Sequence, residues 1–209
     1  MITKRQPTAV VTGADRGLGL ALTSGLLDTG WRVFTGQYKA DWPELGELAV
    51  RHSESLTLVP LDVSSQASAL EAARLAGEHT DTLDLLISNA GVNSPKRTAT
   101  ICEGQDYEEM HRLYDTNSLG ALRMVEAFLP LMQTSAMKRL CFVSSEAGSI
   151  TRAKRNAWFS YCMSKAALNM GVQLLFNDLR LGGYTFRLYH PGGIDLPPRM
   201  FPVLELGYG

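Results

Sequence analysis

The sequence has almost no net charge and no long hydrophobic run. Its 20 lysines and arginines nearly balance 21 aspartates and glutamates, which leaves a formal net charge of −1. A chain with so weak an overall field is not expected to bind nucleic acid or an anionic membrane surface. Residues 1–7 are too few and too polar for a signal peptide, and no later segment reaches the roughly 18 apolar residues of a membrane span. We therefore expect a cytoplasmic protein.

Cysteine is also scarce. The three cysteines, Cys102, Cys141 and Cys162, are odd in number, form no Cys-x-x-Cys pair and have no metal-site histidine spacing around them. We expect reduced, mostly buried thiols and no metal. Repeats, low-complexity tracts and linkers are absent from the sequence too, so residues 1–209 are expected to form one domain with one core.

Short runs of β-branched residues alternate with longer helical patterns along the whole chain. Strands are expected at Thr8–Thr12, Trp31–Thr35, Leu56–Pro60, Leu83–Ser88, Arg139–Ser144 and Tyr184–His190. Helices are expected near residues 17–29, 43–52, 66–78, 106–133 and 157–181. With right-handed crossovers, this alternation predicts an α/β fold, a doubly wound Rossmann domain with six parallel strands in the order 3-2-1-4-5-6. Ligands of such sheets bind beyond the carboxyl ends of the strands, so the loops there should carry the function.

A glycine-rich loop directly follows the first expected strand. It reads Thr12-Gly13-Ala14-Asp15-Arg16-Gly17-Leu18-Gly19 and leads into a helical pattern. Glycines allow a tight turn, a close approach of the backbone to a pyrophosphate and close packing of helix on strand, and a helix N-terminus favours negative charge. A tight turn without a ligand is the alternative for an isolated glycine triplet. The position between a strand and a helix favours phosphate binding.

The spacing of these glycines resembles the TGxxxGxG loop of classical short-chain dehydrogenases/reductases. Further motifs follow in that family's order: Asp62 after the third strand, Ser88-Asn89-Ala90-Gly91 after the fourth, Asn117 in a long helix, and Tyr161-Cys162-Met163-Ser164-Lys165. Together the motifs run from residue 12 to about residue 195, so the resemblance covers nearly the whole chain.

The resemblance implies a nicotinamide cofactor at the strand ends, with its pyrophosphate on the glycine loop and its adenine beside Asp62 and Val63. The residues expected to bind it are Gly13, Arg16, Gly17, Leu18, Gly19, Gln37, Asp62, Val63, Asn89, Ala90, Gly91, Tyr161, Lys165, Pro191, Gly192 and Ile194. For Asn89 a purely structural role, tying strand ends together, stays open beside this one.

The end of the second strand distinguishes NADP from NAD. An acid there hydrogen-bonds the ribose 2′-hydroxyl, whereas a cation accommodates the 2′-phosphate. The segment Thr35-Gly36-Gln37-Tyr38-Lys39 carries no acid, and Arg16 and Lys39 are cations that can face a phosphate. We expect NADP(H) as the preferred cofactor, with NAD(H) left open. An exposed Arg16 without a ligand is the alternative.

Tyr161 and Lys165 are the expected catalytic pair. Residues four apart share a helix face, so both side chains border the same cleft. A free tyrosine has a pKa near 10, and a neighbouring ammonium, helped by an oxidised nicotinamide, favours its phenolate. Tyr-x-x-x-Lys alone is common by chance. Together with the earlier motifs, it predicts acid–base catalysis.

A serine and an asparagine complete the expected catalytic set. A hydroxyl at the end of the fifth strand can stabilise charge that develops on a carbonyl oxygen. The family's serine resembles the second of the pair Ser144-Ser145, so we expect Ser145, with Ser149 as the alternative because the following loop is long. Asn117 resembles the family asparagine that distorts its helix and holds a water leading to Lys165. A polar helix residue with a satisfied side chain is its alternative.

These residues predict hydride transfer between the cofactor and a small carbonyl or alcohol substrate. In reduction, Ser145 would polarise the carbonyl and Tyr161 would donate the proton. Two departures from the family motivate an alternative, a cofactor-binding protein without efficient turnover that acts as a regulator or partner subunit, although the intact catalytic set argues against it. Asp195 stands where a threonine is usual, and only 14 residues follow it, so the C-terminal lid and a seventh strand are expected to be missing. A nucleotide-sugar epimerase is disfavoured because the extra C-terminal domain of such enzymes is absent from the sequence.

Loops after the strands and two long helices are expected to form the substrate pocket and the subunit interface. Residues 92–98 and 153–158 should line the pocket, where Trp158 and Phe159 either cover an apolar substrate or pack on a neighbouring subunit. The helices near 106–133 and 157–181 resemble the family's oligomer-forming pair, so we expect a homodimer or homotetramer.

Overall fold

The computed structural model describes residues 5–39 and 42–192 and the backbone of residues 204–205. The strands are β1 (Thr8–Val11), β2 (Arg32–Gln37), β3 (Leu56–Pro60), β4 (Leu85–Ser88), β5 (Arg139–Val143), β6 (Thr185–His190) and β7 (Leu204–Glu205). The α-helices are α1 (Gly17–Asp28), α2 (Pro43–Arg51), α3 (Gln66–Gly77), α4 (Tyr107–Tyr114), α5 (Gly120–Gln133) and α6 (Phe159–Leu179). Every expected strand and helix overlaps one of these elements.

The strands form one sheet in the order β3-β2-β1-β4-β5-β6-β7. Its first six members are parallel, which confirms the predicted fold and strand order. The two-residue strand β7 pairs antiparallel with β6. It corrects the expectation of no seventh strand, because two residues are too few for a hydrophobic pattern to reveal. The lid expected to be missing concerns residues outside the described ranges.

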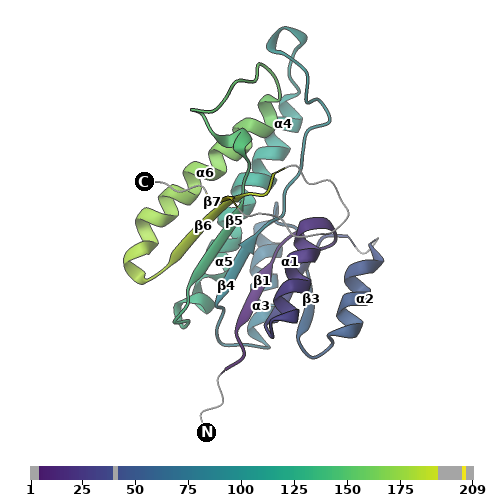
Figure 1. Ribbon diagram of the computed structural model, residues 1–209, viewed down its shortest axis with the longest axis vertical. Helices are drawn as coiled ribbons and strands as arrows, with labels where there is room; N and C mark the ends of the chain where they lie inside the picture. The colour runs from purple at the N-terminus through teal and green to yellow at the C-terminus, as the bar shows by residue number, and fades with distance from the viewer. Residues whose placement is uncertain (1–4, 40–41, 193–203, 206–209) are drawn as a thin grey trace.

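Both faces of the sheet are covered by helices, as Figure 1 shows. Successive residues of β1 point to opposite sides: Val10 packs with α3, α5 and α6, whereas Ala9 and Val11 pack with α1 and α2. All four residues of β1 are buried. This double burial explains why the central strands are apolar on successive residues instead of alternating. The chain segments after β4 and β5 rise together beyond the carboxyl ends of the strands.

The long helix expected over residues 106–133 is interrupted. The segment Asp115–Leu119 forms a π-helix between α4 and α5. Asn117 lies at its centre, and its side-chain amide bonds the backbone of Val92 in the loop after β4 instead of pointing to solvent. A π-helical turn is a recognised feature of functional sites. The interruption thus brings the α4–α5 junction against the carboxyl end of β4.

No helix within the described ranges is long and apolar enough to cross a membrane.

The cysteines differ in exposure. Cys102, Cys141 and Cys162 are free thiols, of which Cys102 is exposed and the other two are half-buried. The expectation of mostly buried thiols is therefore wrong for Cys102, which lies in the long loop after β4.

Candidate active site

The ends of β1 and β4 are tied together by side chains. The Thr12 hydroxyl accepts hydrogen bonds from the backbone N–H groups of Asn89 at 3.0 Å and Ala90 at 2.9 Å. In return, the Asn89 amide donates to the carbonyl oxygens of Thr12 and Gly13, both at 3.0 Å. Asn89 therefore has the structural role that the sequence left open, and it also lines the cleft described below.

Crowding explains the glycines of this loop. A Cβ on Gly13, whose φ is +63°, would lie 2.7 Å from the Ala90 Cα. One on Gly19 would lie 2.1 Å from the Gly13 carbonyl oxygen and 2.6 Å from the Asn89 amide nitrogen. No side chain caps the N-terminus of α1, which begins at Gly17 with a φ of +59°. The free N–H groups of that helix end make the loop suitable for a phosphate.

A cleft of about 620 Å³ of empty space, open to solvent, lies beyond the carboxyl ends of β1, β4, β5 and β6. Its lining is Leu18, Asn89, Gly91, Val92, Asn93, Val143, Ser144, Ser145, Tyr161, Lys165, His190, Pro191 and Gly192. The fold thus brings together, from five segments, three of the four expected catalytic residues and five expected cofactor residues besides Tyr161 and Lys165. Those outside this lining are Asn117, Gly13, Arg16, Gly17, Gly19, Gln37, Asp62, Val63 and Ala90. Ile194 and Asp195 lie outside the described residues.

Lys165 reaches the cleft from the interior of the protein. It is 4% exposed, and its Nζ donates to the carbonyl oxygen of Val143 at 2.9 Å. Burial lowers the pKa of this lysine to about 8, because an ammonium is poorly solvated there. Its Nζ lies 5.8 Å from the ring centroid of Tyr161. The pair therefore shares one face of α6, as the four-residue spacing predicts.

Tyr161 and Ser145 meet at the wall of the cleft. A hydrogen bond between their side chains favours the phenolate, but burial of the tyrosine outweighs it and raises the pKa of Tyr161. This direction is opposite to the one expected from Lys165. The expectation also included the positive charge of an oxidised nicotinamide, which lowers the pKa of Tyr161 only when the cofactor is bound. The Ser145 hydroxyl also accepts from the Ala147 N–H at 3.2 Å.

The alternative serine and the asparagine occupy different places. Ser149 lies outside the cleft lining, with its hydroxyl 3.4 Å from that of Thr151. Asn117 is 2% exposed, and its Oδ1 accepts from Val92 N–H at 2.7 Å while its Nδ2 donates to the Val92 carbonyl and Ser164 hydroxyl. A Cβ on Gly91 would lie 3.2 Å from the Asn117 Oδ1 and 3.6 Å from the Lys165 Nζ. The side chain of Asn117 is thus fully hydrogen-bonded, and Gly91 lies between it and Lys165.

The end of β2 shows which polar groups surround the adenosine side. Gln37 is half-buried as the last residue of β2. Arg16 is exposed, and its Cζ lies 4.7 Å from the ring centroid of Trp42. The Asp15 carboxylate accepts from the backbone N–H groups of Tyr38 at 3.1 Å and Lys39 at 3.3 Å. Sequence reasoning missed Asp15, although an acid among the loop glycines is a signal that could have found it.

The two residues expected beside the adenine differ in burial. Asp62 is half-exposed, and its carboxylate accepts from the N–H and hydroxyl of Ser64 at 2.9 and 2.6 Å. Val63 is 7% exposed and belongs to the core, where a Cβ on Gly120 would lie 3.0 Å from it. Any contact of Val63 with a ligand is therefore made mainly by its backbone.

Two further residues mark the substrate side of the cleft. Trp158 has a φ of +67°, and its ring stacks on that of Tyr161 at 4.6 Å between centroids and 14° between planes. Its Nε1 donates to the Asn93 Oδ1 at 3.0 Å. His190, which sequence reasoning missed, lines the cleft with a buried Nδ1 that has no hydrogen-bond partner among the described residues. Nor does the described part hold a group of three His, Cys, Asp or Glu side chains placed to bind a metal.

The family is decided by sequence comparison. The model of the short chain dehydrogenase family matches residues 7–201. The chain belongs to the short-chain dehydrogenase family. This confirms the resemblance drawn from the glycine loop and the Tyr-x-x-x-Lys motif, and with it the prediction of an oxidoreductase.

Individual relatives agree with this assignment. An uncharacterized oxidoreductase of Schizosaccharomyces pombe is 34% identical over 184 residues, which are 87% of this chain and 71% of the relative. The structure of an NADPH-bound carbonyl reductase from chicken fatty liver is 33% identical with a TM-score of 0.81, covering 90% of this chain and 80% of that one. The carbonyl reductase Sniffer of Drosophila melanogaster is 26% identical with a TM-score of 0.83, covering 90% and 81%.

Alanine at two glycines of α1 tests the close approach of the loop to β4. We expect Gly19→Ala to destabilise the protein by about 1–3 kcal/mol, because its Cβ meets backbone atoms, and to weaken NADPH binding. Gly25→Ala is the control, because nothing lies within 4 Å of its Cβ, and alanine in a helix is favoured by up to about 1 kcal/mol. Thermal unfolding and NADPH fluorescence titration measure both. Equal behaviour of the two variants would contradict the crowding argument.

Proposed function

We propose that the protein reduces aldehydes or ketones with NADPH and oxidises the corresponding alcohols in reverse. The observation that carries this proposal is the presence of Tyr161 and Ser145 together on the wall of a cleft that also contains the buried Lys165. Two hydroxyl donors that converge on one point suit a carbonyl oxygen on which negative charge develops. The alternative without turnover is not favoured, because these three side chains lie together in one cleft.

The cleft suits a nicotinamide dinucleotide. The loop of Gly13, Gly17 and Gly19, which is crowded at Gly13 and Gly19, has backbone N–H groups that suit the pyrophosphate, and Asn89, Pro191 and Gly192 border the cleft beyond it. The bound nicotinamide would supply the hydride, which is chemistry that side chains do not provide. We propose that Lys165 holds the adjacent ribose through its Nζ, which already lies in the cleft lining.

Each catalytic side chain has a separate proposed task in reduction. Ser145 donates a hydrogen bond to the substrate oxygen and orients it. Tyr161 donates the proton, and its raised pKa keeps the hydroxyl protonated at neutral pH until the oxygen becomes basic. Lys165 then favours the phenolate that remains. Asn117 positions the loop through Val92 and, we propose, holds the water that returns a proton toward Lys165.

Replacement of Tyr161 by phenylalanine tests the mechanism. The change removes only the hydroxyl, so NADPH binding should persist while kcat/KM for aldehydes falls by about 10²- to 10⁴-fold, the usual contribution of a general acid. Fluorescence titration with NADPH and NADH, followed by an aldehyde and ketone panel, gives both quantities. Tyr107→Phe, at an exposed tyrosine of α4, is the control and should change neither. A wild-type protein that binds without turnover would support the alternative, and one that binds neither cofactor would contradict the proposal.

We propose NADPH as the preferred cofactor, with NADH as a weaker one. Arg16 supports this, because its exposed guanidinium lies over Trp42 beside the end of β2, and no carboxylate pairs with it among the described residues. The NADPH bound to the chicken carbonyl reductase gives further support. The Asp15 carboxylate, which opposes a phosphate, is occupied by the backbone N–H groups of Tyr38 and Lys39.

The cofactor preference can be measured with Arg16→Ala. Loss of a charge-assisted hydrogen bond to the 2′-phosphate should weaken NADPH binding about tenfold or more and change NADH binding little. Fluorescence titration of both cofactors gives the ratio. Arg51→Ala, at an exposed arginine in the last turn of α2, is the matched control. An equal loss for the two cofactors would show that Arg16 does not read the 2′-phosphate.

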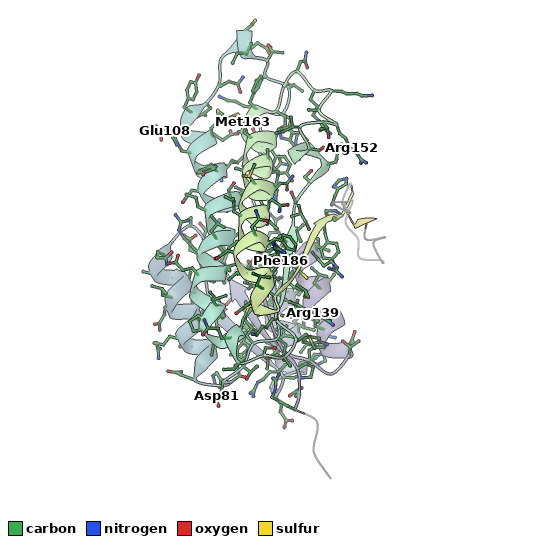
Figure 2. All side chains as sticks on the ribbon, turned by 90° about the vertical axis from the view of Figure 1, so that its left-hand side faces the viewer. Asp81, Glu108, Arg139, Arg152, Met163 and Phe186 are labelled. Atoms are coloured by element: carbon green, nitrogen blue, oxygen red, sulfur yellow. The ribbon has the colours of Figure 1, made fainter. Side chains whose placement is uncertain are left out.

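We also propose that residues 1–209 form one domain and that the protein assembles as a homodimer or homotetramer. We propose the cytoplasm as its location, because free thiols stay reduced there. The support for assembly is an exposed apolar row on α6, made by Met163, Met170 and Leu174, together with the exposed Tyr114 on α4. Figure 2 shows α4 and α6 side by side on one face, with Met163 on α6. Apolar side chains that gather on one face are typical of protein interfaces.

Light scattering at micromolar concentration tests the assembly. We expect the mass of a dimer or tetramer for the wild type and a smaller mass for Met170→Glu, because a charge in the centre of the row must be desolvated on association. Lys154→Glu, at an exposed loop position outside this row, should leave the mass unchanged. A monomeric wild type would contradict the proposal.

A further inference from the structure

Two loops next to the substrate side of the cleft carry positive charge only. Val92 and Asn93 of the first loop line the cleft, whereas the second loop reaches it through Trp158, which stacks on the cleft residue Tyr161. Residues 92–98 include Lys96 and Arg97, residues 149–158 include Arg152, Lys154 and Arg155, and neither segment contains an acid. An isolated antiparallel bridge between Thr100 and Ala157 joins the chain segments after β4 and β5. The bond from the Trp158 Nε1 to Asn93 joins them a second time. The two loops therefore form one cover with five cations, although the whole chain has a net charge of −1.

Trp158 connects this positive cover to the proposed proton donor. Its ring stacks on Tyr161, and the Cζ atoms of Arg97 and Arg155 each lie 5.4 Å from its centroid. The left-handed backbone of Trp158 is a strained conformation for a non-glycine residue, which persists only where the surroundings hold it. Trp158 thus contacts both a guanidinium and the ring of the tyrosine whose hydroxyl would meet the substrate carbonyl.

Only some of these cations are free to bind a ligand. Arg155 forms an ion pair with Glu146, and Lys96 pairs with Asp106 at 3.5 Å. Arg97 has no ion-pair partner within the described ranges and is exposed. It therefore differs from its neighbours in being both unpaired and in contact with the ring that covers Tyr161.

The acids nearest to this cover are already engaged. Glu146 is held by Arg155, Asp106 faces Lys96 and caps α4, Glu103 accepts from Thr100, and Glu109 accepts from Ser160. None of them neutralises Arg97 in the described part of the chain. The positive charge at the mouth of the cleft is thus available to a ligand, and a guanidinium placed over an aromatic ring keeps its N–H groups free for a carboxylate.

We propose that the substrate carries a carboxylate besides its carbonyl and that Arg97 binds this carboxylate over the face of Trp158. The inference rests on the function proposed above and names the substrate class of the same site. The Arg97 Cζ lies 5.4 Å from the Trp158 ring centroid, which lies 4.6 Å from the Tyr161 ring centroid. These two separations limit how far the carboxylate at Arg97 can lie from the carbonyl at Tyr161. An aldehyde and a carboxylate at opposite ends of one benzene ring are suitably spaced.

Two aldehydes that differ in one charge test the proposal. 4-Carboxybenzaldehyde carries the carboxylate, and methyl 4-formylbenzoate is its neutral ester, whose electron-withdrawing group makes the aldehyde intrinsically more reactive toward hydride, so that a preference for the carboxylate is not an electronic effect. With NADPH, we expect the wild type to show a kcat/KM at least tenfold higher for the carboxylate. The excess should reside mainly in KM and should shrink with added salt, because it depends on an exposed charge.

Variants then locate the effect. Arg97→Gln should lower the ratio of the two kcat/KM values about tenfold, the size of a lost charge-assisted hydrogen bond, and Arg97→Lys should retain part of it. The matched control is Arg152→Gln, at a residue labelled in Figure 2, which removes an exposed cation from the same cover. Within the described residues, the cation–π contacts of Trp158 are with Arg97 and Arg155 and not with Arg152. It should leave the ratio near that of the wild type.

The possible results separate the two proposals. A wild type that reduces the ester as well as the carboxylate, or an Arg97→Gln variant with an unchanged ratio, would overturn the inference and leave the reductase function intact. An equal fall in the ratio for Arg152→Gln would assign the preference to the general field of the cover and also overturn a specific role for Arg97. Reduction of neither aldehyde by protein that binds NADPH would overturn the proposed function and the inference with it.

Discussion

The close contact between the glycine loop and the end of β4 is the constraint on which the rest of the site depends. Thr12 receives two N–H groups from the β4 side, and Asn89 returns two hydrogen bonds to the β1 side. This exchange leaves no room for a Cβ at Gly13 or Gly19. It lies at the switch point between β1 and β4, where the sheet order reverses and the crossovers diverge. The cleft therefore depends on these two glycines, because the backbone and the side chains of Thr12 and Asn89 already fill this junction.

A second constraint is the burial of Lys165 beneath the cleft. An ammonium at 4% exposure is costly unless it is hydrogen-bonded, and the Val143 carbonyl provides one partner. Lys165 is so closely surrounded that two neighbouring positions are glycines. A Cβ on Gly148 would lie 2.6 Å from the Lys165 backbone, and a Cβ on Gly91 would lie 3.6 Å from the Lys165 Nζ. The π-helix brings Asn117 to the same place. Small residues and a helix irregularity thus create a pocket for one charged group whose pKa lies near 8.

Much of this arrangement follows from the sequence, because it depends on local patterns. The strands and helices follow from hydrophobic runs, and the glycine loop and the Tyr161–Lys165 spacing locate the cleft. The features that sequence reasoning missed depend on contacts between distant segments. Nothing local indicates that Asn117 reaches the backbone of Val92, that burial dominates the pKa of Tyr161, or that Asp15 accepts N–H groups from the residues after β2. Such effects arise only when the loops meet.

The two sides of the cleft are therefore determined by different physics. On the cofactor side, backbone and glycines leave little freedom, since a Cβ on Gly13 or Gly19 would meet a main-chain atom. On the substrate side, Trp158, Arg97 and Arg155 project from loops, and their contacts are ring stacking and ion pairs between long side chains. Loop side chains of this kind can change without disturbing the sheet. The family assignment therefore defines the redox chemistry, whereas the choice of substrate must be read from the charge and shape of these two loops.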